Sequence, residues 1–466
     1  MTTADTPTTT AAPAGVDGSA GVDGSVAVDG SAAVNGSVAV NGSVAVGVAG
    51  SPDRTDGPAR NSGVSTAPPR PAVERAETDA SVPARTTADS PARVVGLDGV
   101  RGLAALFVVM NHIFLRAWPG FPANHAPFWA ADFIYGRLAV VVFIALSGFS
   151  LSLAPARKGW RFDSVARFAH RRAWRILPPY WAALGFSLVM TWYVLAQPGW
   201  PVPNGKSVVV NGLLIQDAVP AASPNRAFWS LAIEAQLYIL LPLLLLIVRR
   251  VSAFAMAGVV AAIVVTVGVL GPHVALMNDA VVKFTPDLAV LFAIGVFAAG
   301  IVTASERTRS RPWAWYAAVA AVPAVVLIAL QGWTWSNNNL FWTDLAWGPA
   351  IGCFLAAVAT RRPRPVVRVL STGPLRTLGS VSYSLYLTHA PIVIAVSYGL
   401  VLGRVAPGTP TFLVLTAVVV PVTVCFARLF GAVFELPFQR HRGWQPLRRA
   451  MSERVHRLIR PDSATV

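Results

Sequence analysis

The chain has 466 residues, of which 54% are hydrophobic and only 13% are charged. Soluble globular proteins usually carry about 25% charged residues, so this composition excludes an ordinary soluble enzyme. It also excludes disorder over the whole chain, because disordered segments combine low hydrophobicity with high charge. The net charge of +16 comes mainly from arginine. In so apolar a chain, this charge favours a membrane protein with basic loops on one side.

Residues 1–94 form a low-complexity segment that is rich in Ala, Gly, Ser, Thr, Pro and Val, and we expect it to be a disordered tail and linker. Positions 16–45 hold five copies of a hexapeptide of the type VDGSVA. Hexapeptide repeats can build a left-handed β-helix, but five short copies bury too little surface for a stacked core. Each copy also contains a D-G or N-G turn signal. We see no pattern that indicates a signal peptide.

From residue 97 onward, the chain contains apolar segments of about the 20 residues that a helix needs to cross a bilayer. Ten such segments lie at about 97–117, 137–155, 176–196, 227–248, 252–271, 286–304, 313–331, 340–360, 378–402 and 410–434. The predicted fold class is an all-α integral membrane protein. We expect a bundle of about ten transmembrane helices over residues 95–440, followed by a basic cytoplasmic tail over 441–466.

The basic residues fall on alternate sides of this predicted bundle. With the N-terminal tail in the cytoplasm, the inner segments hold 24 basic residues and the outer segments hold 6. This asymmetry follows the positive-inside rule at every loop. We therefore expect a multi-pass protein of the cell membrane with both termini in the cytoplasm. Because the charge is spread over five inner segments, the sequence also predicts no nucleic-acid binding.

Several ionisable residues lie within the predicted spans, where a charge is costly and is a functional hypothesis by default. Arg101 and His112 in the first span are eleven residues apart, which is close to three helical turns, so they share one face. Counting along the fourth and ninth spans puts Glu234 and His389 near the depth of His112. We expect these three side chains to meet in one buried pocket. The structural alternative is that each one only bonds to a neighbouring helix.

A second basic feature, RFAHRRAWRILPPYW, precedes the third span. Arg172 and Arg175 are three residues apart and share a helix face. Their guanidinium groups suit a phosphate ligand, and the alternative is interfacial anchoring to anionic lipid. In the second span, Ser147 and Gly148 are small residues of the kind that permits close helix packing. The predicted outer loop over 197–226 is polar and Pro-rich and is available to help bind an extracytoplasmic glycan.

Other polar or reactive residues in apolar segments have structural interpretations. Asp287 and Asp344 lie near predicted span ends and are interpreted as anchors. Glu435 is interpreted as a salt-bridge partner at the end of the tenth span. Cys353 and Cys425 are too few for a zinc site or a disulfide framework, so we expect two buried small side chains.

Six strings in this part of the chain resemble the membrane-bound acyltransferase 3 family, a group of integral-membrane O-acyltransferases. They occur in the order that the family shows. The strings are LDGVRGLAALFVVMNH (97–112), VVFIALSGFSL (141–151), RRAWRILPPYW (171–181), AFWSLAIEAQLY (227–238), LGSVSYSLYLTHAPI (378–392) and FELPFQR (434–440).

The resemblance implies transfer of an acyl group, often acetyl, from acyl-CoA to a hydroxyl group. The acceptor would be a carbohydrate, a glycolipid or a glycosylated small molecule. The resemblance also implies that Arg101 and His112 form the family's essential Arg-x10-His pair. It assigns Arg172 and Arg175 to the family's R-x-x-R motif and Glu234 to the acid of its WSL-E segment.

We also expect His389, Tyr383 and Ser147 to be further residues of the pocket. The resemblance implies acyl-CoA as co-substrate, and we expect no bound cofactor and no metal. Some relatives carry a C-terminal SGNH hydrolase domain, which we do not expect here because about thirty residues follow the tenth span.

These residues suggest a mechanism. An alcohol is a poor nucleophile at neutral pH and needs a base as it attacks a thioester. His112 is the predicted base, and Glu234 is predicted to orient its ring, by the logic of a Ser-His-Asp triad. Arg101, Arg172 and Arg175 are predicted to bind the phosphates of coenzyme A.

Two other classes of protein remain open at this point. A proton-coupled transporter or flippase also uses histidine and glutamate at mid-membrane, although we see no matched half-repeats here. A structural membrane scaffold would not need ionisable residues that converge at one depth. Transfer that depends on acyl-CoA would distinguish the enzyme from both, and solute flux in proteoliposomes would identify the transporter.

Overall fold

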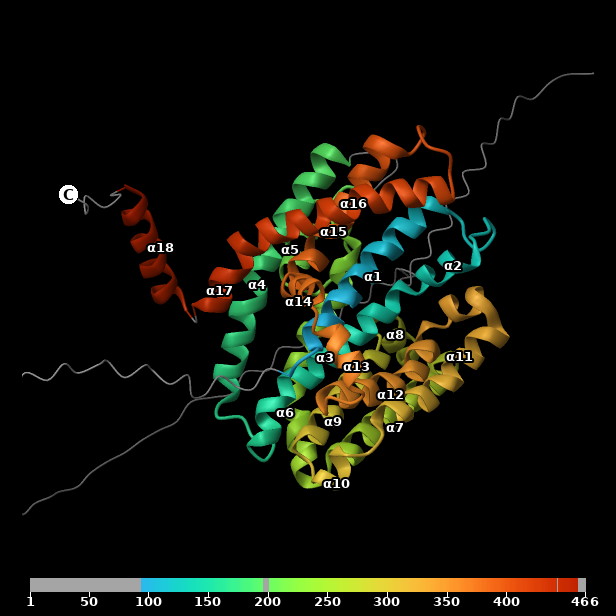
Figure 1. Ribbon diagram of the computed structural model, residues 1–466, viewed down its shortest axis with the longest axis vertical. Helices are drawn as coiled ribbons and strands as arrows, with labels where there is room; N and C mark the ends of the chain where they lie inside the picture. The colour runs from blue at the N-terminus through green and yellow to red at the C-terminus, as the bar shows by residue number, and fades with distance from the viewer. Residues whose placement is uncertain (1–93, 196–200, 442, 460–466) are drawn as a thin grey trace, which may run out of the picture. The chain divides into compact units, whose positions relative to one another are not determined.

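The computed structural model describes residues 94–195, 201–441 and 443–459 (Figure 1). The predicted disordered tail and its hexapeptide repeats therefore lie outside the described residues, apart from Val94. Within the described ranges the regular secondary structure is entirely helical. The α-helices are α1 (Leu97–Ala117), α2 (Phe128–Ala131), α3 (Gly136–Arg157), α4 (Val165–Val189), α5 (Gly205–Gly212), α6 (Trp229–Arg250), α7 (Ala253–Leu270), α8 (Ala275–Phe284), α9 (Asp287–Thr303), α10 (Glu306–Arg309), α11 (Trp313–Asn338), α12 (Leu340–Ala359), α13 (Arg364–Leu370), α14 (Gly373–Ser380), α15 (Ser382–Val396), α16 (Thr409–Phe430), α17 (Leu436–Arg440) and α18 (Trp444–Ile459).

Each of the ten predicted spans coincides with a helix. Within the described residues, eight helical stretches are long and apolar enough to cross a membrane: Leu97–Ala117, Phe128–Arg157, Arg226–Arg250, Ala253–His273, Trp313–Asn338, Leu340–Ala359, Ser382–Val401 and Thr409–Arg440. The other two predicted spans are α9, which is apolar but has 17 residues, and α4, whose first half carries several arginines. The protein is an all-α membrane protein built from a bundle of about ten helices.

The candidate spans differ in how far their neighbours cover them. In the stretch that contains α15, 67% of the most apolar window is buried, against 17% for the stretch of α7 and 11% for α11. Apolar helices with so little cover present their side chains outward, as expected for contact with lipid. Helix α15 instead lies inside the bundle, where it contacts α1, α4 and α16 (Figure 1).

Helix α3 packs very closely against α9. A Cβ atom on Gly148 would overlap the main-chain carbonyl oxygen of Phe292, and one on Gly295 would overlap that of Ala145. Main-chain atoms inside a helix cannot move aside cheaply, so both positions require glycine. The sequence prediction of close helix packing at Ser147 and Gly148 is confirmed.

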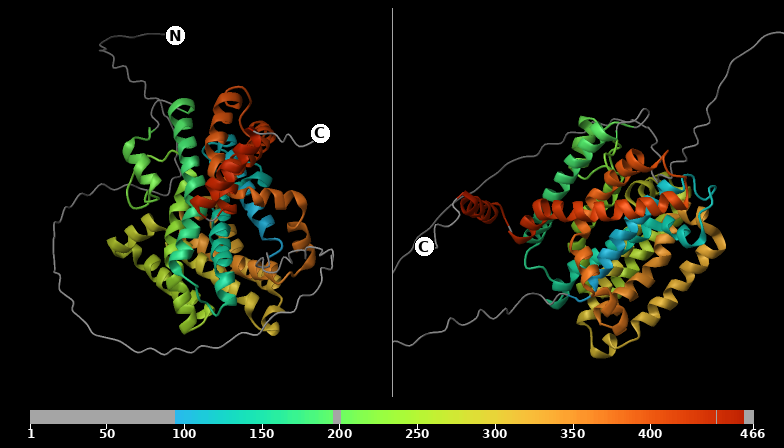
Figure 2. Two further views of the ribbon diagram at one scale, coloured as in Figure 1. Left: turned by 90° about the vertical axis from the view of Figure 1, so that its left-hand side faces the viewer. Right: turned by 45° about the horizontal axis from the view of Figure 1, so that its top comes forward.

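The connection between α4 and α6 folds back along the bundle. Its helix α5 lies beside α4 (Figure 2). The Tyr180 hydroxyl donates to the main-chain oxygen of Asn211 at 2.7 Å, and the Trp181 indole donates to that of Gly212 at 2.9 Å. Tyr180 and Trp181 are in the middle of α4, so the segment predicted as a polar outer loop packs against that helix well away from its end.

Candidate active site

Two histidines meet inside the bundle. The rings of His112 on α1 and His389 on α15 have centroids 4.9 Å apart, with their planes 63° from parallel. His389 is completely buried at 0% exposure, whereas His112 is partly buried. His112 is therefore the more exposed member of the pair, and His389 is the more buried one.

Main-chain oxygens hold the ring of His389. Its Nδ1 lies 2.8 Å from the oxygen of Tyr386 and 3.2 Å from that of Leu385, both one turn earlier in α15. Its Nε2 is buried and has no hydrogen-bond partner in the described part of the chain. The Tyr386 hydroxyl is already engaged, since it donates to the Ala227 oxygen at 3.0 Å and pairs with the Ser230 hydroxyl at 2.5 Å.

A proline helps to fix this part of α15. Pro391 has no N–H, so the main-chain oxygen of Leu387 lacks its normal helical donor. The buried side chain of Asn225 supplies a replacement and donates to that oxygen at 3.0 Å. The residues just before α6 are thereby attached to the turn of α15 that carries His389.

Glu234 lies with tyrosines and an arginine. The Tyr238 hydroxyl donates to its carboxylate at 2.5 Å and is 3.1 Å from the Ser147 hydroxyl. Glu234 also interacts electrostatically with Arg172. Among the described residues, no hydrogen bond joins Glu234 to His112. The structure thus brings together two of the three side chains expected in one pocket, whereas the third, Glu234, is bonded to Tyr238.

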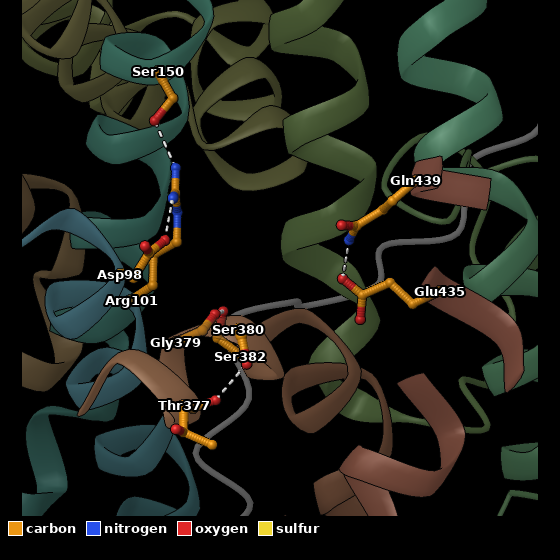
Figure 3. Close-up of polar contacts among 9 residues, drawn as sticks. All are labelled: Asp98, Arg101, Ser150, Thr377, Gly379, Ser380, Ser382, Glu435 and Gln439. Atoms are coloured by element: carbon orange, nitrogen blue, oxygen red, sulfur yellow. Dashed lines mark hydrogen bonds and ion pairs between the residues drawn. The ribbon is translucent and has the colours of Figure 1, made fainter. Parts of the chain in front are cut away.

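The three arginines singled out in the sequence belong to one region. Arg101 donates to Ser150 at 2.6 Å and lies 3.4 Å from Asp98 (Figure 3). It also interacts electrostatically with Arg175, which is exposed. The guanidinium of Arg172 lies over the ring of Phe168 at 5.8 Å, and its Nε is buried without a hydrogen-bond partner. Like charges gathered in this way attract anions.

Glu435 and Tyr383 border the arginine region. The Glu435 carboxylate accepts a hydrogen bond from Gln439 at 2.6 Å (Figure 3). It accepts a second one from Ser384 at 2.5 Å. It also interacts with the charge of Arg175. The Tyr383 hydroxyl donates to the main-chain oxygen of Ile176 at 3.1 Å and so links α15 to α4.

Sequence analysis missed a buried charged cluster at the other end of α3. Arg137 donates to Asp344 at 2.6 Å and to Asp287 at 3.1 Å, and its guanidinium lies 4.9 Å from the ring of Trp229. Both carboxylates are buried. The sequence contained a pattern that could have predicted this cluster, because Arg137, Asp287 and Asp344 all lie at or near the first turns of apolar helices. In the described part of the chain, no group of His, Cys, Asp and Glu side chains could hold a metal ion.

A model of the acyltransferase 3 family, described as an acyltransferase domain, matches residues 94–428. The chain belongs to the acyltransferase 3 family. The match covers α1 to α15 and most of α16, so it includes both histidines and all the arginines described above. The resemblance to this family that the sequence strings indicated is confirmed.

Curated relatives of this acyltransferase 3 protein bear names that agree with the family. The chain is 28% identical over 329 residues to acyltransferase MdmB of Streptomyces mycarofaciens, covering 65% of this chain and 80% of MdmB. It is 23% identical over 343 residues to O-acetyltransferase OatA of Staphylococcus aureus, covering 68% of this chain but only 53% of OatA. It is 34% identical over 128 residues to O-acetyltransferase PaAT-1 of Phomopsis amygdali, covering 23% of this chain and 25% of PaAT-1. No solved structure matches the chain.

Proposed function

We propose that this acyltransferase 3 protein moves an acyl group, normally acetyl, from acyl-CoA to a hydroxyl group of a carbohydrate, a glycolipid or a glycosylated small molecule. The observation that carries the proposal is the partly buried His112, which contacts His389 and lies on the same helix as Arg101. The two α1 residues are about 16 Å apart along the helix at 1.5 Å per residue. A base and an anion-binding group are thus available on one face of α1.

His112 is the proposed general base. As the alcohol oxygen bonds to the carbonyl carbon of the thioester, its proton passes to the free ring nitrogen of His112. The carbon–sulfur bond then breaks, and the leaving thiolate takes that proton from the ring. The products are the ester and free coenzyme A, and His112 returns to its starting state.

The arginine region is the proposed donor site. Coenzyme A carries several phosphate charges, and arginine guanidinium groups bind phosphate oxygens in a two-pronged geometry. The buried and unpaired Nε of Arg172 supports this assignment, because a buried donor without a partner is costly unless a ligand completes it. The competing interpretation is anchoring of these arginines to anionic lipid.

The proposed orientation puts both chain ends and the arginine region on the cytoplasmic side, where acyl-CoA is available. The excess of basic residues on that side supports it. The connection between α4 and α6 then faces the other side, and it is the first place to look for acceptor contacts.

The test is release of free coenzyme A by purified protein in nanodiscs. Acetyl-, propionyl- and longer acyl-CoAs are supplied with and without a panel of glycosides and glycolipids. We expect release that needs both an acceptor and His112, with His112→Gln slower by about 10²- to 10⁴-fold, the usual contribution of a general base. His125→Gln, which changes an exposed histidine after α1, is the matched control and should keep the wild-type rate.

Two results would overturn the proposal. A folded His112→Gln protein that transfers at the wild-type rate would exclude His112 as the base. A protein that neither releases coenzyme A nor binds acyl-CoA would exclude the donor assignment.

A further inference from the structure

The main chain determines where the proton of His389 lies. Carbonyl oxygens accept hydrogen bonds and cannot donate them. Because the Nδ1 atom of His389 faces the oxygens of Tyr386 and Leu385 at 2.8 and 3.2 Å, that nitrogen carries the hydrogen. Both oxygens belong to the preceding turn of α15, so the helix that carries His389 also selects its tautomer.

The other nitrogen of His389 is an acceptor with no donor. A doubly protonated ring would need an acceptor at Nε2, and none is present among the described residues, so the neutral ring fits this site. The lone pair then lies on Nε2, which is fully buried. Leaving a buried acceptor unpaired costs free energy, and such atoms are rare in folded proteins.

The neighbouring group able to donate to this nitrogen is the ring of His112. The two ring centroids are 4.9 Å apart and the planes are 63° from parallel, so the His112 ring is within reach of Nε2 of His389 and its rotation can turn an N–H toward that nitrogen. Within the described residues, no hydrogen bond to the His112 side chain is present. The Tyr386 ring is also near, at 5.8 Å, but its hydroxyl is engaged with Ala227 and Ser230.

We propose that His389 is a positioning residue that accepts a hydrogen bond from His112 and thereby keeps the opposite nitrogen of His112 free to act as the base. This inference rests on the proposed function of His112 and adds a second histidine to it. The burial of the two rings supports these roles, since His389 is fully buried and His112 is partly exposed. A neutral imidazole here takes the place that a carboxylate has in a Ser-His-Asp triad.

The proposal also accounts for the proton through the whole cycle. The alcohol proton enters and leaves at the free nitrogen of His112, while the N–H at the other nitrogen stays bonded to Nε2 of His389. Both histidines end the cycle as they began it. Glu234 is not needed as the orienting acid, because its carboxylate is bonded to Tyr238 and interacts with Arg172.

Two substitutions of His389 separate positioning from a merely structural role. His389→Asn keeps a donor near the position of Nδ1, for the oxygens of Leu385 and Tyr386, but it has no distal acceptor. His389→Gln places an amide oxygen near the position of Nε2, where it can accept from His112. We expect kcat to fall by about 10- to 100-fold in His389→Asn, the usual effect of losing a group that orients a catalytic or ligating histidine. His389→Gln should keep most of the wild-type kcat, and KM for acyl-CoA should be unchanged in both.

A spectroscopic measurement gives a second, activity-independent readout. Solid-state NMR of protein labelled with ¹⁵N in its histidine rings distinguishes the two tautomers by nitrogen chemical shift. The His112 signal is identified by its loss in His112→Gln. We expect a single His112 tautomer in the wild type and in His389→Gln, and a mixture or the other tautomer in His389→Asn.

The outcomes separate this inference from the proposed function. If His112→Gln abolishes transfer while His389→Asn keeps the wild-type kcat and the wild-type tautomer of His112, then the base is correct and the positioning role is wrong. The positioning role would also be overturned if His389→Asn kept the wild-type kcat and His389→Gln did not. That result would follow from the bonds to Leu385 and Tyr386 alone. If His112→Gln transfers normally, the proposed function of His112 fails first.

Discussion

Two groups of arginines use the same side chain in opposite ways. In the first, which we call the closed cluster, Arg137 is surrounded by Asp287, Asp344 and Trp229. In the second, the open cluster, Arg101, Arg172 and Arg175 lie near one another. There the positive charges are only partly matched, and one arginine nitrogen is buried without a partner.

Both clusters involve α3: Arg137 lies in its first turn, and Arg101 contacts Ser150 about two turns before its end. The closed cluster pairs its arginine with two buried carboxylates within the fold, so it has the properties of a structural clamp that joins α3, α9 and α12. The open cluster leaves hydrogen-bonding capacity and positive charge unused, which is the property of a binding site for an anion. The residues that contact each arginine therefore distinguish the structural role from the binding role, whereas the residue type alone does not.

The largest expected effect is in the closed cluster. Arg137→Gln removes the cation between two buried carboxylates and should destabilise the protein by about 3–5 kcal/mol. The measurement is the thermal unfolding of purified protein in detergent. Arg137→Lys is the matched control, and it should fall between the wild type and the glutamine variant because it keeps the charge but loses the planar two-sided geometry.

Acyl-CoA affinity tests whether this cluster is only structural. We expect the folded fraction of Arg137→Gln to bind acyl-CoA as the wild type does. A variant of normal stability with weakened donor binding would instead assign Arg137 to the substrate site.

The second effect is in the open cluster. Arg172→Gln should weaken acyl-CoA binding by about 10- to 100-fold, since hydrogen bonds to charged groups contribute about 1.5–3 kcal/mol. Unfolding temperature should change little. Arg171→Gln alters an exposed neighbour on the same helix and should leave the Kd for acyl-CoA near the wild-type value. Equal affinities in all three proteins would favour lipid anchoring as the role of this arginine.

A smaller effect is expected where the open cluster meets α3. Ser150→Ala removes the hydroxyl that accepts from Arg101 at 2.6 Å. We expect a loss of about 1 kcal/mol, typical of a single intramolecular hydrogen bond, and a modest rise in KM for acyl-CoA as the guanidinium loses its fixed direction. Ser152→Ala, on the same helix, is the control for KM. A larger stability loss than that of Arg137→Gln would reverse the contrast between the clusters.

Two aspartates outside the spans give effects that depend on pH. Burial raises the pKa of Asp217 from 3.8 to about 6, although a hydrogen bond from Gln236 opposes the shift. The folded state then holds this proton more tightly than the unfolded state, so the ionised carboxylate lowers stability increasingly from about pH 4 to about pH 6. Asp217→Asn should unfold at a higher temperature than the wild type at pH 7.5 and at the same temperature near pH 4.

Asp163 has the opposite sign. A hydrogen bond from Lys158, together with its charge, lowers the pKa of this exposed carboxyl. Its small contribution to stability is present at neutral pH and is lost as the pH falls through its lowered pKa. Asp163→Asn should therefore be slightly less stable than the wild type at pH 7.5, and the difference should disappear in acid. Parallel unfolding curves at every pH would contradict both assignments.

Much of the fold could be predicted because apolar length and basic loops report directly on membrane spans. The ten predicted segments coincide with helices, and the spacing of Arg101 and His112 correctly put them on one helix. Residue counting gave the position of Glu234 along α6 but not the rotation of that helix, and the rotation decides that Glu234 contacts Tyr238. The two clusters of arginines were equally hard to tell apart, because their partners come from helices far away in the sequence.

The connection between α4 and α6 was also beyond prediction from sequence. Its polar, Pro-rich composition is typical of a loop on the surface, and local patterns do not report that Asn211 and Gly212 pack against the middle of α4. The pairing of Asn225 with Leu387 depends on the missing N–H of Pro391, which is visible in the sequence, but the chain gives no sign of which side chain replaces it.

That pairing makes the α4–α6 connection part of an energetic linkage. If the connection moves and withdraws Asn225, the Leu387 oxygen, two residues before His389, loses its donor. The movement is then less favourable by the free energy of that lost hydrogen bond. By reciprocity, whatever stabilises this turn of α15 also stabilises the position of the connection in which Asn225 bonds to Leu387. The position of the α4–α6 connection and the conformation of the helical turn that carries His389 are therefore coupled. Asn225 and Pro391 provide the coupling.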